Sequence, residues 1–272
     1  MKIETEILDN GRLFVNRAFL DMLRAHKLTS TSSIWNVSSD PVKKVVKERG
    51  TEKLFLDDVE FFIKRCSLIS LKEKVKSAFS LKFRNFDALN EWNALLRFHE
   101  LGLNTMTPVA SGALPDGRTF VLTLGLQDYR RASEIFPELQ DAAKKKDLIE
   151  KIASLAGRMH ANGIGHQDFY LVHMFVMNTA QDIYLIDLQR CIVVENLAKR
   201  WIIKDLGQLY FSSRGYVDDK DVEFFISEYG KCFKGKSPLD DRKLRDSILR
   251  KAEKIKNHTD KIIRRRASRR QA

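Results

Sequence analysis

The chain has 272 residues, of which 43% are hydrophobic and 31% are charged, so it can bury a substantial core. It has no run of about 18 apolar residues, and we therefore expect no transmembrane helix. The first residues, MKIETEILDNGRLF, have acids where a signal peptide needs basic residues, and they lack its apolar region. Three dispersed cysteines without a CxxC pair fit a reducing cytoplasm and argue against a cysteine zinc site.

The formal net charge of +12 predicts an anionic partner, which could be a nucleic acid, an acidic membrane surface or a phosphorylated substrate. Part of the excess charge lies in the last residues, KIIRRRASRRQA (261–272). This segment could be a solvated helix end or an anchor for anionic lipid. No helix-turn-helix, RRM or zinc-finger pattern accompanies the charge, so we expect no nucleic-acid partner.

The first half of the chain is rich in strand patterns. Apolar spacing predicts a helix over 14–27, followed by a Ser/Thr-rich connection that ends at Pro41. Three short β-like runs follow, with ERGT between the first two and Asp58 between the last two, which predicts an antiparallel meander. These runs cover residues 42–47, 53–57 and 59–66.

A clear helical pattern with Leu89, Trp92, Leu95, Leu96 and Leu101 on one side covers residues 84–101 and ends before Gly102. Two more strands are predicted around the turn LPDG, and a lobe boundary is expected near residues 124–127. The second half is mostly helical, with a hairpin formed by residues 166–176 and 182–190 around Asn178. Its helices are predicted over 141–162, 197–211, 219–234 and 239–264.

Asp168 and Asp187 each lie beside a short apolar run of this hairpin, which would bring both carboxylates to one end. Two acids at such a place suit a magnesium–nucleotide site, with one acid at the acceptor hydroxyl and the other on the metal. Lys64, at the end of the apolar strand FFIK, could reach the phosphates. Glu91 on the following helix is a candidate partner for this lysine.

The stretch HQDFYLVHMFV (166–176) could also be a zinc site or a buried strand with stray polar residues. His166 and His173 are seven positions apart, no HExxH pattern occurs, and no cysteine is near, so a zinc site is disfavoured. Protein-kinase-like catalytic motifs instead match the pattern of this chain. The matching parts are FFIK, the HxD of His166 to Asp168, a polar residue five positions after that acid, and IDL.

Longer phrases carry a more specific resemblance: EWNALLRFHELGLNTMTPVASG, RMHANGIGHQDFYLVHMFV, IYLIDLQR and RWIIKDLGQLYFSS. Over residues 14–235 the chain resembles the lipopolysaccharide core kinases, the Kdo/WaaP family, which phosphorylate a heptose or Kdo sugar of the inner core. About a dozen and a half residues separate Asp187 from Asp205, too few for the activation segment of a protein kinase.

The resemblance implies roles for individual residues. Asp168 would be the catalytic acid that positions the sugar hydroxyl and accepts its proton. Asp187 would chelate the metal, with His173, in place of the usual asparagine, as a softer second ligand. Lys64 would neutralise phosphate charge and Glu91 would orient it.

Further residues would support the site. His166 and Asp205 would hold the catalytic loop rather than touch substrate, and Gly50 is the only glycine of the expected phosphate-covering loop ERGT. Gln167 replaces the arginine that many kinases use to sense a phosphorylated activation segment, so no such switch is expected.

The implied architecture is an α+β, protein-kinase-like two-lobe fold. Residues 1–126 would form a small β-rich N-terminal lobe with one long helix, and residues 127–272 a larger, mainly helical C-terminal lobe. The implied activity is phosphorylation of a lipopolysaccharide core sugar with ATP and Mg²⁺. We expect a cytoplasmic protein, peripheral at the inner membrane, where its basic tail could contact anionic lipid. A kinase of the same fold acting on small molecules or proteins, or a catalytically silent kinase-like binding module, are the alternatives.

Overall fold

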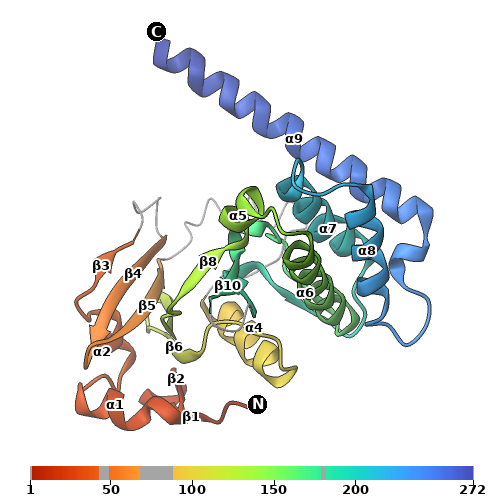
Figure 1. Ribbon diagram of the computed structural model, residues 1–272. Helices are drawn as coiled ribbons and strands as arrows, with labels where there is room; N and C mark the ends of the chain where they lie inside the picture. The colour runs from red at the N-terminus through yellow and green to blue at the C-terminus, as the bar shows by residue number, and fades with distance from the viewer. Residues whose placement is uncertain (1, 43–48, 68–87, 179–181, 272) are drawn as a thin grey trace. The chain divides into compact units, whose positions relative to one another are not determined.

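The computed structural model describes residues 2–42, 49–67, 88–178 and 182–271 (Figure 1). The chain divides into two compact units. The first, here called the sheet unit, comprises residues 1–127 together with 187–190. The second, the helical unit, comprises residues 128–186 and 191–272. Each unit is described by itself.

The sheet unit is built on a seven-stranded antiparallel sheet in the order β1-β2-β6-β7-β5-β4-β3 (Figure 1). Strand β5 lies between β4 and β7, and its Lys64 stands opposite Thr51 and Val121. The strands are β1 (Thr5–Leu8), β2 (Leu13–Asn16), β3 (Asp40–Pro41), β4 (Arg49–Leu56), β5 (Val59–Cys66), β6 (Pro108–Ala113) and β7 (Thr119–Leu124).

The β4–β5 hairpin turns at Asp57 and Asp58, whose φ angles of 49° and 61° match the left-handed conformation that two-residue hairpin turns require. The strand predicted over 59–66 is therefore confirmed, and the one predicted over 53–57 is confirmed as far as Leu56. The expectation that ERGT forms a loop is wrong for residues 49–51, which extend β4 because each pairs with a residue of β5. Of the predicted strand 42–47, residues 43–47 lie outside the described residues.

The helix predicted over 14–27 is wrong at its start. Leu13 and Val15 are fully buried with the alternation of a strand, and the Asn16 amide donates to the carbonyl of Pro108 at 2.9 Å, which ties the end of β2 to β6. Helix α1 (Leu20–Ala25) begins only after a 3₁₀ turn over Arg17–Phe19. The Ser/Thr-rich connection also contains a short helix, α2 (Thr31–Trp35), which has a capping box at its N-cap Ser30.

Helix α4 (Ala88–Glu100) places Glu91 on its buried side together with Trp92, Leu95 and Phe98. The buried side differs from the predicted one, because Leu89, Leu96 and Leu101 are only partly buried, while Ala88, Ala94 and Phe98 complete it. Gly102, with φ of 62°, ends the helical segment as expected.

The helical unit contains a three-stranded sheet, β11-β10-β8, and a short pair, β12-β9. Of the hairpin predicted over 166–176 and 182–190, residues 174–176 and 183–185 pair as antiparallel strands, whereas Leu171–His173 and Leu188–Arg190 form 3₁₀ turns. Strand β8, which pairs with β10, and the short helix after it had no sequence signal. The strands are β8 (Tyr129–Arg131), β9 (Ile164–Gly165), β10 (Met174–Met177), β11 (Ile183–Leu185) and β12 (Ile192–Val193). The α-helices are α5 (Ala132–Ile135), α6 (Ala142–Ala161), α7 (Lys199–Ser213), α8 (Asp219–Gly230) and α9 (Arg242–Gln271).

Helix α9 packs with its first half only. Leu244, Ile248 and Ala252 are buried at a spacing of four, against α7, whereas none of its described residues after Ala252 is buried. The second half of α9 therefore extends away from the rest of the helical unit (Figure 1). Within the described residues, no helix combines the length and the apolar character needed to span a bilayer.

Candidate active site

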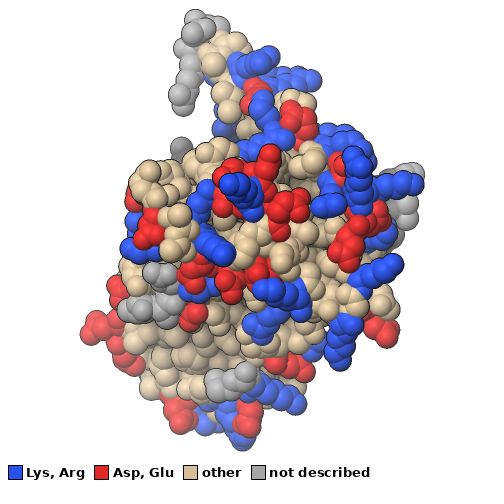
Figure 2. All heavy atoms as spheres, turned by 45° about the vertical axis from the view of Figure 1, so that its right-hand side comes forward, with Lys and Arg blue, Asp and Glu red and all other residues tan. Residues whose placement is uncertain are grey.

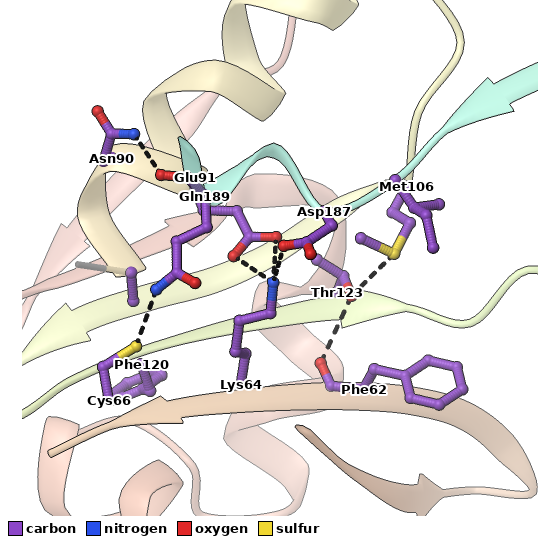
Figure 3. Close-up of polar contacts among 12 residues, drawn as sticks. Phe62, Lys64, Cys66, Asn90, Glu91, Met106, Phe120, Thr123, Asp187 and Gln189 are labelled. Carbon is purple, nitrogen blue, oxygen red and sulfur yellow. Dashed lines mark hydrogen bonds and ion pairs between the residues drawn. The ribbon is translucent and has the colours of Figure 1, made fainter. Parts of the chain in front are cut away.

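The sheet unit brings Lys64, Glu91 and Asp187 together from three separate parts of the chain (Figure 3). The Nζ atom of Lys64 lies 2.9 Å from Oε1 and 2.8 Å from Oε2 of Glu91, and 2.9 Å from Oδ1 of Asp187. The Oε2 contact is ionic, without hydrogen-bond geometry. Exposure rises across the group, from 1% for the Glu91 side chain through 19% for Lys64 to 40% for Asp187. The lysine thus joins a buried anchor to a carboxylate that faces solvent.

Burial disfavours the charge on Lys64, but the carboxylates of Glu91 and Asp187 outweigh it and raise the pKa of the ammonium above its usual value. Burial also raises the pKa of the Glu91 carboxyl, and the Lys64 cation acts in the opposite direction. The lysine is therefore a permanently charged group, held in one place by a carboxylate almost without contact with water. Such a cation can neutralise phosphate oxygens without reorganising.

Residues next to this group tie the segment after Asp187 to the sheet unit. The Asn90 amide of α4 donates to the carbonyl of Gln189 at 2.7 Å, and the Gln189 amide donates to the Cys66 thiol of β5 at 3.3 Å (Figure 3). Asp187 itself has φ of 62°, a left-handed conformation that is uncommon outside glycine. Neither Asn90 nor Gln189 is a residue that the sequence motifs single out, because amides at helix and turn positions carry no signal of their own.

In the helical unit, His166 holds the backbone of the predicted catalytic loop. Its ring is fully buried, with Nε2 at 3.1 Å from the carbonyl oxygen of Ile186 and Nδ1 at 3.2 Å from the backbone N of Asp168. A carbonyl only accepts and a backbone N–H only donates, so Nε2 carries the proton and Nδ1 accepts. The ring thereby connects the loop before Asp168 to the segment that follows β11.

Helix α7 also binds the backbone of this loop. Both oxygens of the Asp205 carboxylate accept backbone N–H groups, from His166 at 2.7 Å and from Gln167 at 2.6 Å. Asp205 is fully buried, so these charge-assisted bonds offset the loss of its hydration. Gln167 has φ of 70°, and its side chain accepts from the Lys204 ammonium at 3.2 Å, where many kinases have an arginine.

Two further side chains of α7 continue this contact. Gln208 accepts from the backbone N of Phe169 at 3.0 Å and donates to the carbonyl of Gln167 at 2.9 Å, and Ser212 accepts from the backbone N of Leu171 at 3.1 Å. Positions 205, 208 and 212 are three and four apart, and they share one face of the helix. The phrase KDLGQLYFSS therefore supplies a row of hydrogen-bond partners for the loop that carries Asp168.

His173 folds back on this loop. Its Nδ1 lies 2.7 Å from the carbonyl oxygen of Asp168, so Nδ1 carries a proton, and in the neutral imidazole the lone pair is on Nε2. An imidazole in this form can act as a ligand or as an acceptor, but it is a softer ligand than Mg²⁺ usually takes.

The described residues contain no group of three or more His, Cys, Asp or Glu side chains that could hold a metal ion. Nucleotide-bound Mg²⁺ takes one or two protein carboxylates and completes its coordination with phosphate oxygens and water. Asp187, partly exposed beside the partly buried Lys64, is a carboxylate suited to this. Gly50, the remaining predicted site residue, lies in β4 opposite Arg65 rather than in a loop.

A lysine held by a helix glutamate beside a second carboxylate is the phosphate-binding arrangement of protein-kinase-like phosphotransferases. Comparison with known proteins then identifies the family. Residues 32–229 match the lipopolysaccharide kinase (Kdo/WaaP) family, and the chain belongs to it. The family and the enzyme class expected from the sequence, a phosphotransferase with an alcohol group as acceptor, are thus confirmed.

The individual relatives agree. The lipopolysaccharide core heptose(I) kinase WaaP of Pseudomonas aeruginosa is 31% identical over 248 residues, 82% of this chain and 92% of the relative. A protein of the same name from Escherichia coli is 31% identical over 205 residues, 69% and 77% of the two chains. A solved structure described as WaaP in complex with acyl carrier protein has a TM-score of 0.70 at 26% identity, covering 89% of this chain and 98% of that one. The expected protein-kinase-like α+β fold is confirmed by this match.

Proposed function

We propose that the chain transfers the γ-phosphate of ATP to a hydroxyl of a heptose in the lipopolysaccharide inner core. The sequence resemblance left heptose and Kdo open as acceptors. Heptose is preferred because the matched relatives from two organisms are named heptose(I) kinases. The observation that carries the proposal is the contact of Lys64 with both Glu91 and Asp187, which suits binding of a nucleotide phosphate.

In this proposal Asp168 orients the sugar hydroxyl and accepts its proton as the phosphate is transferred. Lys64 neutralises charge on the nucleotide phosphates, and Glu91 keeps the ammonium in place. Asp187 would hold Mg²⁺, with the Nε2 lone pair of His173 as a further candidate ligand. When bound, Mg²⁺ supplies positive charge to the phosphate oxygens. The protein itself contributes positioning and charge neutralisation.

The hydrogen bonds from α7 support Asp168 in that role. They hold the backbone on both sides of it, at His166 and Gln167 before and at Phe169 and Leu171 after. A loop fixed at four backbone groups keeps the carboxylate in a constant position, which is the main requirement of a reaction that proceeds by alignment.

We also propose that the protein works at the cytoplasmic face of the inner membrane and contacts anionic lipid through the second half of α9. Residues 261–272 contain six Lys or Arg and no Asp or Glu. The described side chains from Lys261 to Ser268 are all exposed, among them Ile262 and Ile263. Figure 2 shows Lys and Arg side chains along the projecting part of the molecule. A helix with exposed cations and apolar side chains suits an anionic lipid surface, which would bring the enzyme to its lipid-linked acceptor.

The proposal is tested by mass spectrometry of core oligosaccharide from cells that contain or lack the gene. We expect the loss of one phosphate, located on a heptose by fragmentation, and its return when the wild-type gene is restored. A variant Asp168→Asn should not restore it. An unchanged phosphate count would contradict the function, and a phosphate lost from Kdo would correct the acceptor.

A further inference from the structure

Three buried side chains of the helical unit form a continuous hydrogen-bonded row. The hydroxyl of Tyr229, on α8, lies 2.9 Å from Nδ1 of His160, on α6. The Nε2 atom of the same imidazole lies 3.3 Å from Oδ2 of Asp205, on α7. Tyr229 and Asp205 have no exposed surface, and His160 is 3% exposed. Asp205 is the residue whose carboxylate binds the loop next to Asp168.

The direction of each hydrogen bond follows from Asp205. Its oxygens accept the backbone N–H groups of His166 and Gln167, so the carboxylate is the acceptor and Nε2 of His160 donates to it. In the neutral imidazole Nδ1 then has the lone pair, and the Tyr229 hydroxyl donates to it. Burial, with smaller contributions from Cys232 and Asp205, raises the pKa of the Tyr229 phenol, which keeps this donor protonated.

The row matters because the loop it supports is strained. Gln167 adopts φ of 70°, a left-handed conformation that is unfavourable in a residue other than glycine and persists only where its surroundings impose it. Asp205 imposes it through the two backbone N–H groups. His160 is a third donor to the same carboxylate, and it can donate only if its proton is on Nε2.

We infer that Tyr229 is a positioning residue for the phosphotransfer reaction, because its hydroxyl holds the His160 ring in the place from which Nε2 donates to the Asp205 carboxylate that binds the loop of Asp168. The inference rests on the proposed role of Asp168. Tyr229 lies on a helix from which the sequence motifs of the family single out no residue. Its effect is transmitted through two side chains.

Tyr229 also packs against its neighbours, with ring centroids 5.1 Å from Phe233 and 6.0 Å from Phe225. Gly157 of α6 adds to this close packing, because a Cβ atom there would lie 2.8 Å from the carbonyl oxygen of Tyr229. The substitution Tyr229→Phe keeps the ring and removes only the hydroxyl. Phe225→Leu, a matched control, disturbs the ring packing and leaves the hydroxyl in place.

The first test compares kinetics of the purified full chain. For Tyr229→Phe we expect kcat to fall about 5- to 20-fold with the KM for ATP unchanged, because the nucleotide residues of the sheet unit are not altered. In a double-mutant cycle, Tyr229→Phe should have no further effect once His160→Gln is present. A kcat equal to wild type, an equal fall in Phe225→Leu, or additive effects in the cycle would each overturn the inference.

The second test does not depend on activity. Nitrogen-15 NMR of the His160 ring, assigned by its loss in His160→Gln, reports which ring nitrogen carries the proton. We expect a protonated Nε2 and an accepting Nδ1 in the wild type, and in Tyr229→Phe an Nε2 resonance shifted toward a weaker hydrogen bond to Asp205. A protonated Nδ1 in the wild type, or an unchanged Nε2 resonance in the variant, would overturn the inference. An inactive wild type with the expected tautomer would instead refute the proposed function alone.

Discussion

The Nζ atom of Lys64 lies 2.9 Å from Oδ1 of Asp187, although 123 positions separate the two residues along the chain. Lys64 comes from the central region of a sheet, and Asp187 from a four-residue segment that joins the sheet unit from between parts of the helical unit. The contact therefore completes the sheet unit with residues that follow β11. Because Glu91 is buried and contacts the same lysine, the stability of the sheet unit should depend on the charge of Lys64.

Lys64→Met should destabilise the protein by about 3 kcal/mol at pH 8, because it leaves the buried Glu91 carboxylate without its cation. Without Lys64 the pKa of Glu91, already raised by burial, should rise further. A carboxyl whose pKa is raised in the folded state lowers the free energy of unfolding when it is charged. This destabilisation is present above the raised pKa and is relieved as the pH falls below it. Urea unfolding should thus give a smaller deficit at pH 5 than at pH 8.

The matched control is the double variant Lys64→Met with Glu91→Gln, which has no buried charge at this position. Its deficit relative to the wild type should be nearly equal at the two pH values. A single variant whose deficit does not change with pH would contradict the proposed balance between burial and the Lys64 cation.

Two adjacent serines of α7, Ser212 and Ser213, differ in whether they contact the loop of Asp168. Both hydroxyls donate to the carbonyl three residues earlier, Ser212 at 3.0 Å and Ser213 at 3.2 Å, but only Ser212 accepts the backbone N–H of Leu171. Ser212→Ala should cost about 1–3 kcal/mol and speed hydrogen exchange of the Leu171 amide, since that buried donor loses its partner. Ser213→Ala should cost less than about 0.5 kcal/mol and leave that amide unchanged. Equal exchange rates would contradict the role of Ser212.

Substitution of Gly163, in the turn between α6 and the loop of Asp168, tests whether this turn tolerates a side chain. Its φ is 76°, and a Cβ atom would overlap the carbonyl oxygen of Val194, whose N–H donates to the carbonyl of Gly163. Gly163→Ala should cost more than about 3 kcal/mol, as backbone would have to move. Gly215, with φ of 86° and no atom near an added Cβ, is the control, and Gly215→Ala should cost about 1 kcal/mol. Similar thermal shifts for the two variants would contradict the close approach.

Reversing charge on α9 tests the proposed lipid contact. Replacement of Arg264, Arg265 and Arg266 by Glu should abolish cosedimentation with vesicles containing about 30% anionic phospholipid, since each cation near the surface contributes about 1 kcal/mol. Lys220, Lys234 and Lys236 are exposed elsewhere in the helical unit, so the same replacements there give an equal change in net charge. That control should still bind vesicles. Unchanged binding by the α9 variant, or equal loss in both, would exclude α9 as the lipid contact.

Much of the fold could be predicted because residues buried on one face of a strand or helix recur at a regular spacing in the sequence. Strand β5 and helix α6 have patterns set by one face against a core, and their bounds are close to the predicted ones. The start of the predicted helix at residue 14 was wrong, because three consecutive apolar residues fit either period and the Asn16 bond to a residue 92 positions away decides between them. Local spacing carries no information about such a contact.

The candidate site divides in the same way. Lys64, Glu91, Asp168 and Asp187 are charged residues at motif spacings, so the sequence could single them out. Gln208, Ser212 and Tyr229 could not be distinguished, because each acts through a hydrogen bond whose partner is 39–69 positions away and each residue type is common on helices. Polar side chains that support a loop can be recognised only once the packing of the helices is known.

The most direct measurement is phosphate transfer by the purified protein from γ-labelled ATP to lipopolysaccharide core that lacks the heptose phosphate. The wild type should label a heptose, and Asp168→Asn should retain ATP binding while losing about a thousandfold or more in kcat, because the group that orients the hydroxyl is removed. Soluble sugars and protein acceptors, tested in parallel, should remain unlabelled. Equal transfer by the wild type and Asp168→Asn, or labelling of soluble acceptors only, would contradict the proposed reaction.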